Sequence, residues 1–157
     1  MFYVYDNKYK KATTGKTKEW VKTICEMDNE HFMLGSFGGL LEIYSLKGGK
    51  IKSKATYHSF ESREVEFIRK QGNDQFLIGI TNNGFKVVGV NQTRTAFTEE
   101  SAFHYLKKLP VADLVNISGQ KSNIYLAAIR GPAEYWTVDI GSGEEYKLVS
   151  GYSPNGV

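Results

Sequence analysis

The feature of this sequence that most constrains its fold is an internal repeat with a spacing of 44 residues. The segment 31–36 has the same pattern of apolar residues as the segment 75–80. Phe32 thereby aligns with Phe76. The same offset aligns further apolar positions in the flanking segments: Val21 with Val65, Ile24 with Ile68, Leu41 with Phe85, and Ile43 with Val87. A repeat of this length indicates that one supersecondary unit is used more than once along the chain.

A third copy of the unit follows at a longer spacing. The segment 125–129 aligns with 76–80 at an offset of 49 residues. The larger offset implies that residues are inserted between the second and third copies, within 97–109. In this insertion Thr98 could cap a short helix near 98–109, with acidic residues in its first turn.

Each copy has the pattern of four short antiparallel strands. A leading strand, a polar turn, a buried apolar strand and a tight turn are followed by a third strand and a more exposed fourth strand. The tight turns contain Gly38 and Gly39 in one copy and 82–84 (Asn-Asn-Gly) in the next, and these residues tolerate the positive φ of hairpin turns. Four strands in about 40–45 residues are typical of a propeller blade, so we predict an all-β, β-propeller-like fold.

The residues before the first copy match only the last two strands of a blade. The pattern predicts one propeller-like unit over 1–157, with a half blade at 1–15 and blades at 20–58, 64–97 and 112–150. Because propellers close with about four to eight blades, three and a half blades leave two open ends. Three explanations stay open: a fragment of a larger propeller, which we favour, a pair of copies, or an open assembly of sheets.

The second and third strands of the copies resemble the middle strands of WD-repeat blades. The segments 34–46 and 77–88 have the small residues, the short Gly-containing turn and the apolar-x-apolar strand of that family, and 136–139 (Trp-Thr-Val-Asp) resembles the strand's end. The similarity covers about residues 20–150, with degenerate motifs. It implies a rigid, non-enzymatic scaffold for protein–protein contacts.

Composition excludes several classes of protein. Charged residues make up 24% and hydrophobic residues 41%, which is typical of a globular protein, and the net charge is only +3. No apolar run approaches the roughly 18 residues that span a bilayer, and the start of the chain lacks the pattern of a secretory signal. The single cysteine, Cys25, excludes an internal disulfide. We expect an intracellular, cytoplasmic protein without a membrane anchor.

No residue pattern indicates catalysis. The three histidines and Cys25 do not have the short spacings of a metal site, and we expect Cys25 to fill the core and His31 to be a solvated turn residue. The glycine-rich stretch 35–39 is not followed by the Gly-Lys-Ser/Thr of a phosphate-binding loop. We therefore predict no catalytic residues, no metal and no cofactor. An axial ligand-binding or hydrolytic site lined by Glu26, Arg69 and Asn116 is the alternative.

Recognition of a protein partner is expected at the turns of the blades. Phe37, Arg130 and Tyr135 are our candidates for partner binding, because aromatic and arginine side chains are over-represented at interface hot spots. The partner would be another protein, a second copy or further blades. The competing interpretation is that these are ordinary turn residues.

A cluster of lysines lies near the start of the chain. Its members are Lys8, Lys10, Lys11, Lys16 and Lys18. With interleaved tyrosines, this basic patch could contact nucleic acid or an acidic partner. We favour the other interpretation, in which lysines on an outer strand prevent edge-to-edge pairing.

Overall fold

The computed structural model describes residues 1–5, 10–58, 62–100, 103–117, 119, 123–131 and 134–148. In these residues the protein has three four-stranded antiparallel sheets and one two-stranded sheet, and no helix. The two-stranded sheet contains β1 (Phe2–Tyr5) and β2 (Lys11–Gly15). The first four-stranded sheet contains β3 (Val21–Asp28), β4 (His31–Ser36), β5 (Leu40–Lys47) and β6 (Lys50–His58).

The other two sheets repeat this order of strands. The second sheet contains β7 (Val65–Lys70), β8 (Gln75–Ile80), β9 (Phe85–Val90) and β10 (Phe97–Glu100). The third sheet contains β11 (Val111–Asn116), β12 (Ile124–Ile129), β13 (Glu134–Asp139) and β14 (Glu145–Leu148). The predicted all-β fold with three four-stranded sheets and a preceding half blade is confirmed.

The register of the strands confirms that the three sheets are equivalent. The aligned aromatic residues of the second strands pair with the same position of the third strand in each sheet: Phe32 with Tyr44, Phe76 with Val88, and Tyr125 with Val138. The offset found in the sequence is therefore a spatial repeat.

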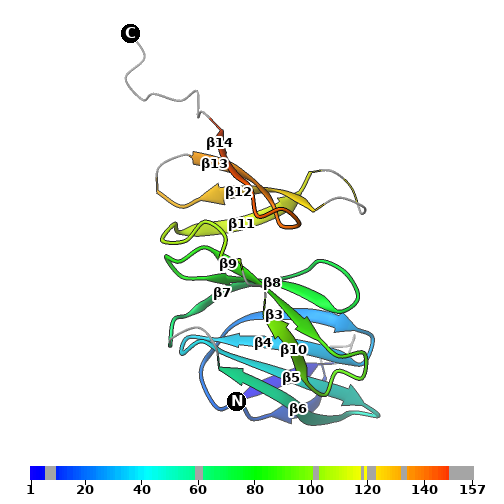
Figure 1. Ribbon diagram of the computed structural model, residues 1–157. Helices are drawn as coiled ribbons and strands as arrows, with labels where there is room; N and C mark the ends of the chain where they lie inside the picture. Colours follow the sequence, from blue (N-terminus) through cyan, green and yellow to red (C-terminus); the bar gives the residue numbers. More distant parts are fainter. Residues whose placement is uncertain are drawn as a thin grey trace.

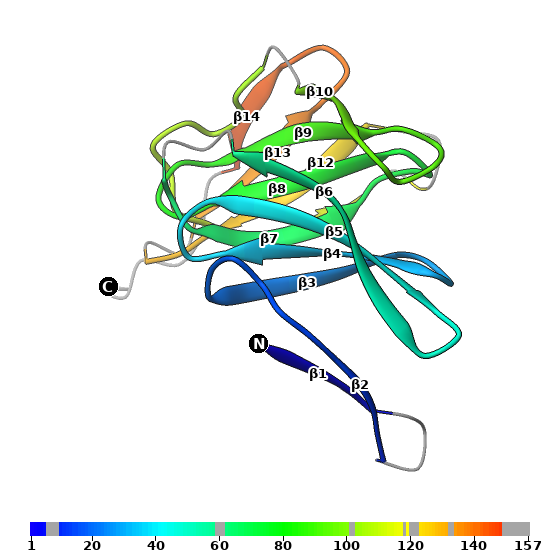
Figure 2. The same cartoon turned by 90° about the horizontal axis from the view of Figure 1, so that it is seen from below.

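The sheets are stacked in chain order, as Figure 1 shows. The first strands β3, β7 and β11 lie next to one another along one edge of the stack, and β6 lies next to β10 along the other. Figure 2 shows the same sheets from below, with the β1–β2 hairpin beside the first sheet. Innermost first strands and outermost fourth strands give the stack a propeller-like arrangement.

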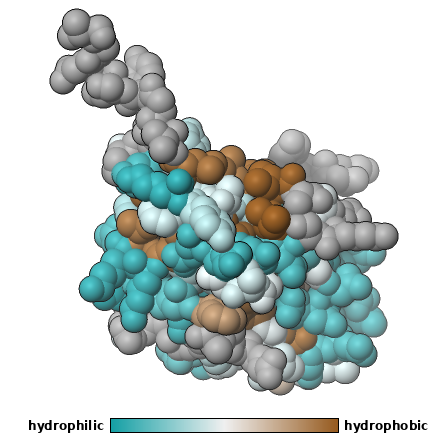
Figure 3. Space-filling model, turned by 45° about the horizontal axis from the view of Figure 1, so that its top comes forward, coloured by the Kyte–Doolittle hydropathy of each residue, from teal (hydrophilic) through white to brown (hydrophobic). Residues whose placement is uncertain are grey.

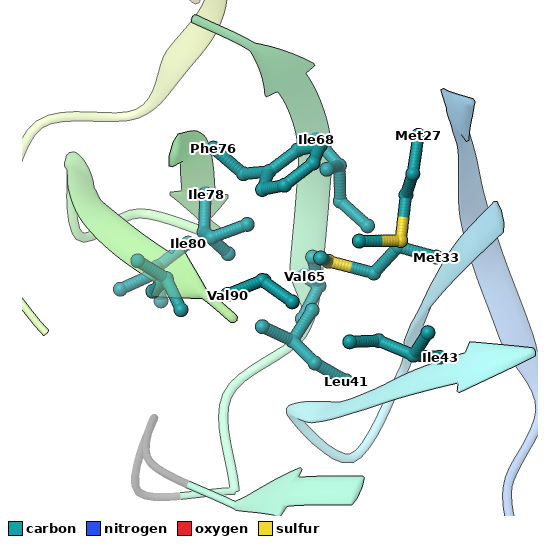
Figure 4. Packing of buried hydrophobic residues seen from close by; sticks show 11 residues of the cluster. Met27, Met33, Leu41, Ile43, Val65, Ile68, Phe76, Ile78, Ile80 and Val90 are labelled. Carbon is teal, nitrogen blue, oxygen red and sulfur yellow. The ribbon is translucent and has the colours of Figure 1, made fainter. Parts of the chain in front are cut away.

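Two apolar layers hold the sheets together. The layer between the first and second sheets contains the residues shown in Figure 4, among them Met27, Met33, Ile43, Ile68 and Phe76. A second layer lies between the second and third sheets, with Phe67, Leu77, Phe85, Tyr105 and Ile129 among its members. The alternation of strand side chains between two faces sends one set of residues of the second sheet into each layer.

The tight turns have the backbone that their residues predict. Gly39 has a φ of +87°, and in the equivalent turn Asn82 and Gly84 have φ values of 54° and 66°. A Cβ atom on Gly84 would collide with the carbonyl oxygen atoms of Tyr105 and Leu106. Glycine is therefore required there for two independent reasons.

The prediction of a short helix near 98–109 is wrong: the described residues of this segment form no helix. Residues 97–100 form β10, in which Phe97 pairs with Val90 and stacks on Tyr57 with 5.1 Å between the ring centroids. Further along, Leu106 and Lys108 have positive φ values, which a right-handed helix does not allow. No helix in the described part of the chain has the length and hydropathy that crossing a bilayer would need.

Candidate interaction surface

The second strand of each sheet should be buried on both faces, but in the third sheet it is not. From Phe76 to Ile80, every residue of β8 is buried. In β12, which is an equally apolar strand, buried residues alternate with partly buried ones. The third sheet therefore has one face in the second apolar layer and one face that no described strand covers.

The uncovered face of the third sheet carries exposed apolar side chains from all four strands. We call these residues the end face: Val115, Ile124, Tyr135, Tyr146 and Leu148. The register places them on one side, because Tyr135 pairs with Leu148, and Tyr146 pairs through Thr137 and Leu126 with Val115. Figure 3 shows apolar side chains gathered at this end of the molecule.

The repeat shows how unusual this exposure is. Ala128 and Gly79 are equivalent positions, and they pair with Tyr135 and Phe85 respectively. Phe85 is fully buried against the third sheet, whereas Tyr135 is 47% exposed. The end face therefore has the apolar character of a sheet face that packs against another layer. Contiguous exposed apolar patches of this kind mark interaction sites.

Tyr135, one of the three residues predicted to bind a partner, therefore lies within the end face. The other four members were not predicted. Only Ile124 had a signal in the sequence, the near-continuous apolar run of β12, which is typical of a strand covered on both faces. The apolar pattern of β12 does not show which layer covers its second face.

Phe37 and Arg130 lie in a different place, in the turns that directly follow β4 and β12. The guanidinium of Arg130, from the third sheet, pairs with the carboxylate of Glu66 in the second sheet. Glu66 accepts a second bond from Lys22 Nζ of the first sheet at 2.8 Å, and this Nζ lies 5.4 Å from the centroid of the half-exposed Phe37 ring. The structure thus joins the two predicted residues in one network across three sheets.

The network changes the ionisation of Glu66. Burial alone would raise the pKa of Glu66, but hydrogen bonds from Lys22, Arg130 and Thr81 lower it to about 2. Glu66 is therefore charged at neutral pH and neutralised by its two cationic partners. Arg130 acts as a link between sheets in this arrangement, in addition to any contact with a partner.

A second network, which sequence reasoning missed, ties the first two sheets together at the opposite ends of their strands. Arg94 is buried, and it donates to Asp28 at 3.2 Å, to Asp74 at 2.7 Å and to the carbonyl of Asn73. Burial alone would raise the pKa of Asp28, but hydrogen bonds from His31, the amide of Glu30 and Arg94 lower it to about 2. Nothing in the spacing of Arg94 distinguishes it from a surface residue.

The residues considered for catalysis or metal binding are not brought together. Among the described residues, no group of three or more His, Cys, Asp or Glu side chains could hold a metal ion. Cys25 packs against the first apolar layer, and burial raises the pKa of its thiol. His31 was expected to be a solvated turn residue, but it is partly buried and its Nδ1 lies 2.8 Å from Asp28 Oδ1.

The proposed axial set is divided. Arg69 and Asn116 line a groove of about 790 Å³ between β7 and β11, and Arg69 forms an ion pair with Asp113 at 2.9 Å. Glu26 lies in another groove, beside β1. These two grooves share no lining residue, so neither of them brings all three side chains together.

The basic patch is only partly within the described residues. Lys10, Lys16 and Lys18 are exposed. Lys8 and the side chain of Lys11 lie outside the described part. The exposed lysines fit either of the two interpretations that the sequence left open.

No protein-family model matches this chain, and a search of curated proteins finds no match.

Proposed function

We propose that this protein is a non-enzymatic protein–protein interaction scaffold of WD-repeat-like, β-propeller type, and that its end face docks a partner protein. The observation that carries the proposal is the contrast between Tyr135, which is 47% exposed, and its buried equivalent Phe85. The end face has the side-chain chemistry of a layer that packs on another sheet. Its partner would present an apolar surface of matching shape.

Side-chain chemistry supports this role. Two tyrosines of the end face, Tyr135 and Tyr146, offer large apolar surfaces with a polar hydroxyl, a combination enriched at interfaces. The sheet beneath them is held by the second apolar layer and by the link from Arg130 to Glu66. A rigid support of this kind reduces the ordering cost of association. An intracellular location stays a prediction of the sequence.

The test places a photo-crosslinking amino acid at position 135 and, as a control, at position 52, where an exposed lysine lies on the outer strand β6. We expect a crosslinked protein specific to position 135. That protein would then be purified, and Leu148→Lys is expected to weaken its binding at least tenfold, while Lys52→Ala leaves it unchanged. Equal crosslinking at both positions, or binding that is insensitive to Leu148→Lys, would contradict the proposal.

A second candidate function is binding of a small polar ligand at the inner edge of the stack. The groove between β7 and β11 is lined by polar residues including Arg69, Asn116 and Gln71. Among the described residues, Oε1 of Gln71 is buried without a hydrogen-bond partner. A thermal-shift screen with divalent cations and small polar ligands tests this function. A shift of several degrees would support ligand binding, because a ligand that binds only the folded state stabilises it.

A further inference from the structure

The β1–β2 sheet has two strands, where each of the other sheets has four. β2 lies next to β6, the outermost strand of the first sheet, so the two strands occupy the outer positions of a blade. On its other side, the edge of β1 faces no described strand. No strand among the described residues therefore occupies the two inner positions of this blade.

The open positions leave apolar residues of the first sheet uncovered. Ile24 is 63% exposed, whereas Ile68, its equivalent in the second sheet, is 1% exposed. Val21 is 36% exposed, and its equivalent Val65 is fully buried. Each exposed residue thus has a counterpart, 44 residues further along, that a neighbouring sheet covers.

The half blade covers only the outer part of this face. The ring of Phe2, in β1, contacts Phe32 and Tyr44 edge-on with centroid distances of 5.7 and 5.4 Å. Beside it lies a groove of about 490 Å³, bounded by β1 on one side and by Val21, Ile24 and Leu34 beneath. The open edge of β1 and the apolar groove are therefore adjacent.

The second sheet shows what kind of group fills such a groove. Ile68 is covered by Met27 and Met33, which come from the two inner strands of the first sheet and point into the layer between the sheets (Figure 4). The corresponding cover for Ile24 is a pair of adjacent strands with apolar side chains at alternate positions. In a second folded copy β3 to β14 already lie in complete four-stranded sheets, and β1 and β2 already hold the outer positions of that copy's own blade.

Glu26, a charged residue in the groove, indicates which polar group the occupant should carry. Glu26 lines the groove at the position equivalent to Lys70. Lys70 Nζ reaches back to the preceding sheet and donates to the carbonyl oxygen of Met27 at 2.6 Å. A carboxylate at the same position accepts hydrogen bonds instead. The occupant should therefore present a basic side chain or an N–H group to Glu26.

We propose that this groove accepts a β-hairpin from a partner protein, which pairs with the edge of β1 and completes a fourth four-stranded sheet. The main-chain hydrogen bonds of the added strand supply affinity, and its alternating apolar side chains and basic residue supply specificity. The groove lies against the first sheet and the end face belongs to the third sheet, and these two sheets are at opposite ends of the stack (Figure 1). This inference extends the proposed scaffold role, but the two surfaces are tested by different variants, so either can fail alone.

The probe is a cyclised synthetic β-hairpin in which valine and threonine alternate along both strands and one lysine is placed to reach Glu26. Its binding to the protein is measured by calorimetry, with hydrogen exchange of the β1 amides as the structural readout. We expect binding, with protection of β1, and a loss of at least tenfold in Ile24→Lys. The control Ile117→Lys changes an isoleucine of similar exposure, 50%, beyond β11 and is expected to bind like the wild type.

Two further arms separate strand pairing from general apolar binding. A hairpin with N-methylated amides along its pairing edge keeps its side chains and is expected to lose binding. Glu26→Lys is expected to reverse the preference between the lysine hairpin and one that carries glutamate at that place. Absence of binding, equal binding of the N-methylated hairpin, or an Ile24-dependent dimer in sedimentation without peptide would overturn the proposal.

Discussion

Lys22 and Glu66 occupy equivalent positions of consecutive repeats, 44 residues apart, and their side chains form an ion pair with 2.8 Å between Nζ and Oε2. Stacking places equivalent positions of successive sheets beside one another. Opposite charges at this position therefore link two sheets, and Arg130 extends the link to the third.

Acidification is expected to weaken this link. Burial alone would raise the pKa of Glu66, but its hydrogen bonds lower it from 4.5 to about 2. A carboxyl group whose pKa is lower in the folded state stabilises the fold above its unfolded pKa, and this contribution is lost as the pH falls from about 4.5 towards 2. In urea unfolding, Glu66→Gln should lose less stability over this window than the wild type.

The pKa of Asp28 is also lowered to about 2, so Asp28 adds to the same acid dependence. The double variant Asp28→Asn/Glu66→Gln should therefore have a flatter pH profile than either single variant. A Glu66→Gln profile parallel to that of the wild type would show that the network does not stabilise the fold.

Arg94 is expected to be more important than its place in a turn indicates. Its guanidinium donates to Asp28, Asp74 and the carbonyl of Asn73 from three different nitrogen atoms. The single nitrogen of a lysine ammonium group cannot reproduce this geometry. We expect Arg94→Lys to lower the free energy of unfolding by about 2 kcal/mol. Lys47→Ala, which removes an exposed ion pair with Glu30, should cost less than about 0.5 kcal/mol. Equal effects in denaturant melts would contradict this role.

The same substitution at two equivalent positions should have unequal effects. Ile68→Ala leaves a cavity in the first apolar layer and is expected to cost about 3 kcal/mol. Ile24→Ala removes side-chain atoms that are already largely in water, so its cost should stay below about 0.5 kcal/mol. Unfolding followed by circular dichroism measures both. A similar cost at the two positions would mean that Ile24 is covered in solution.

A pair of glycine substitutions tests the packing of the second sheet. A Cβ atom on Gly79 would collide with the ring of Phe67, which is packed in the second apolar layer, so Gly79→Ala should cost about 2 kcal/mol. Gly72→Ala places its methyl group in open space and should leave the melting temperature nearly unchanged. A neutral Gly79→Ala variant would show that the Phe67 ring has another position available.

The strands could be predicted because their signals are local. Period-two alternation, glycine-containing turns and the offset between Phe32 and Phe76 all act over a few residues or repeat along the chain. The prediction of a helix near 98–109 was wrong because a capping residue and acidic residues indicate only a local preference. In the structure Phe97 stacks on Tyr57 of another sheet, and Tyr105 stacks on Phe85 with 4.9 Å between their centroids. These contacts outweigh the weak local preference for a helix.

The candidate sites also depend on contacts between sheets, which local sequence signals do not contain. Tyr135 is a predicted binding residue because it is an aromatic residue near a turn, and the structure places it within the end face. Arg130 is a predicted binding residue because it is an arginine beside a turn, but its guanidinium is paired with Glu66 from another sheet. Residue type suggests which side chains are able to bind. It contains no information about which of them are already engaged by a distant part of the chain.

The amino-acid sequence alone determined the repeating unit, its four strands and its turns, because each depends on the conformations and spacing of neighbouring residues. Only the tertiary structure decided which of the equivalent apolar positions stay in water. Ile24 and Ile68 have the same side chain and the same place in their repeats, and they differ only in what is stacked against them. Exposure is a property of the neighbouring layer, so it follows from the stacking of the sheets and not from the strand itself.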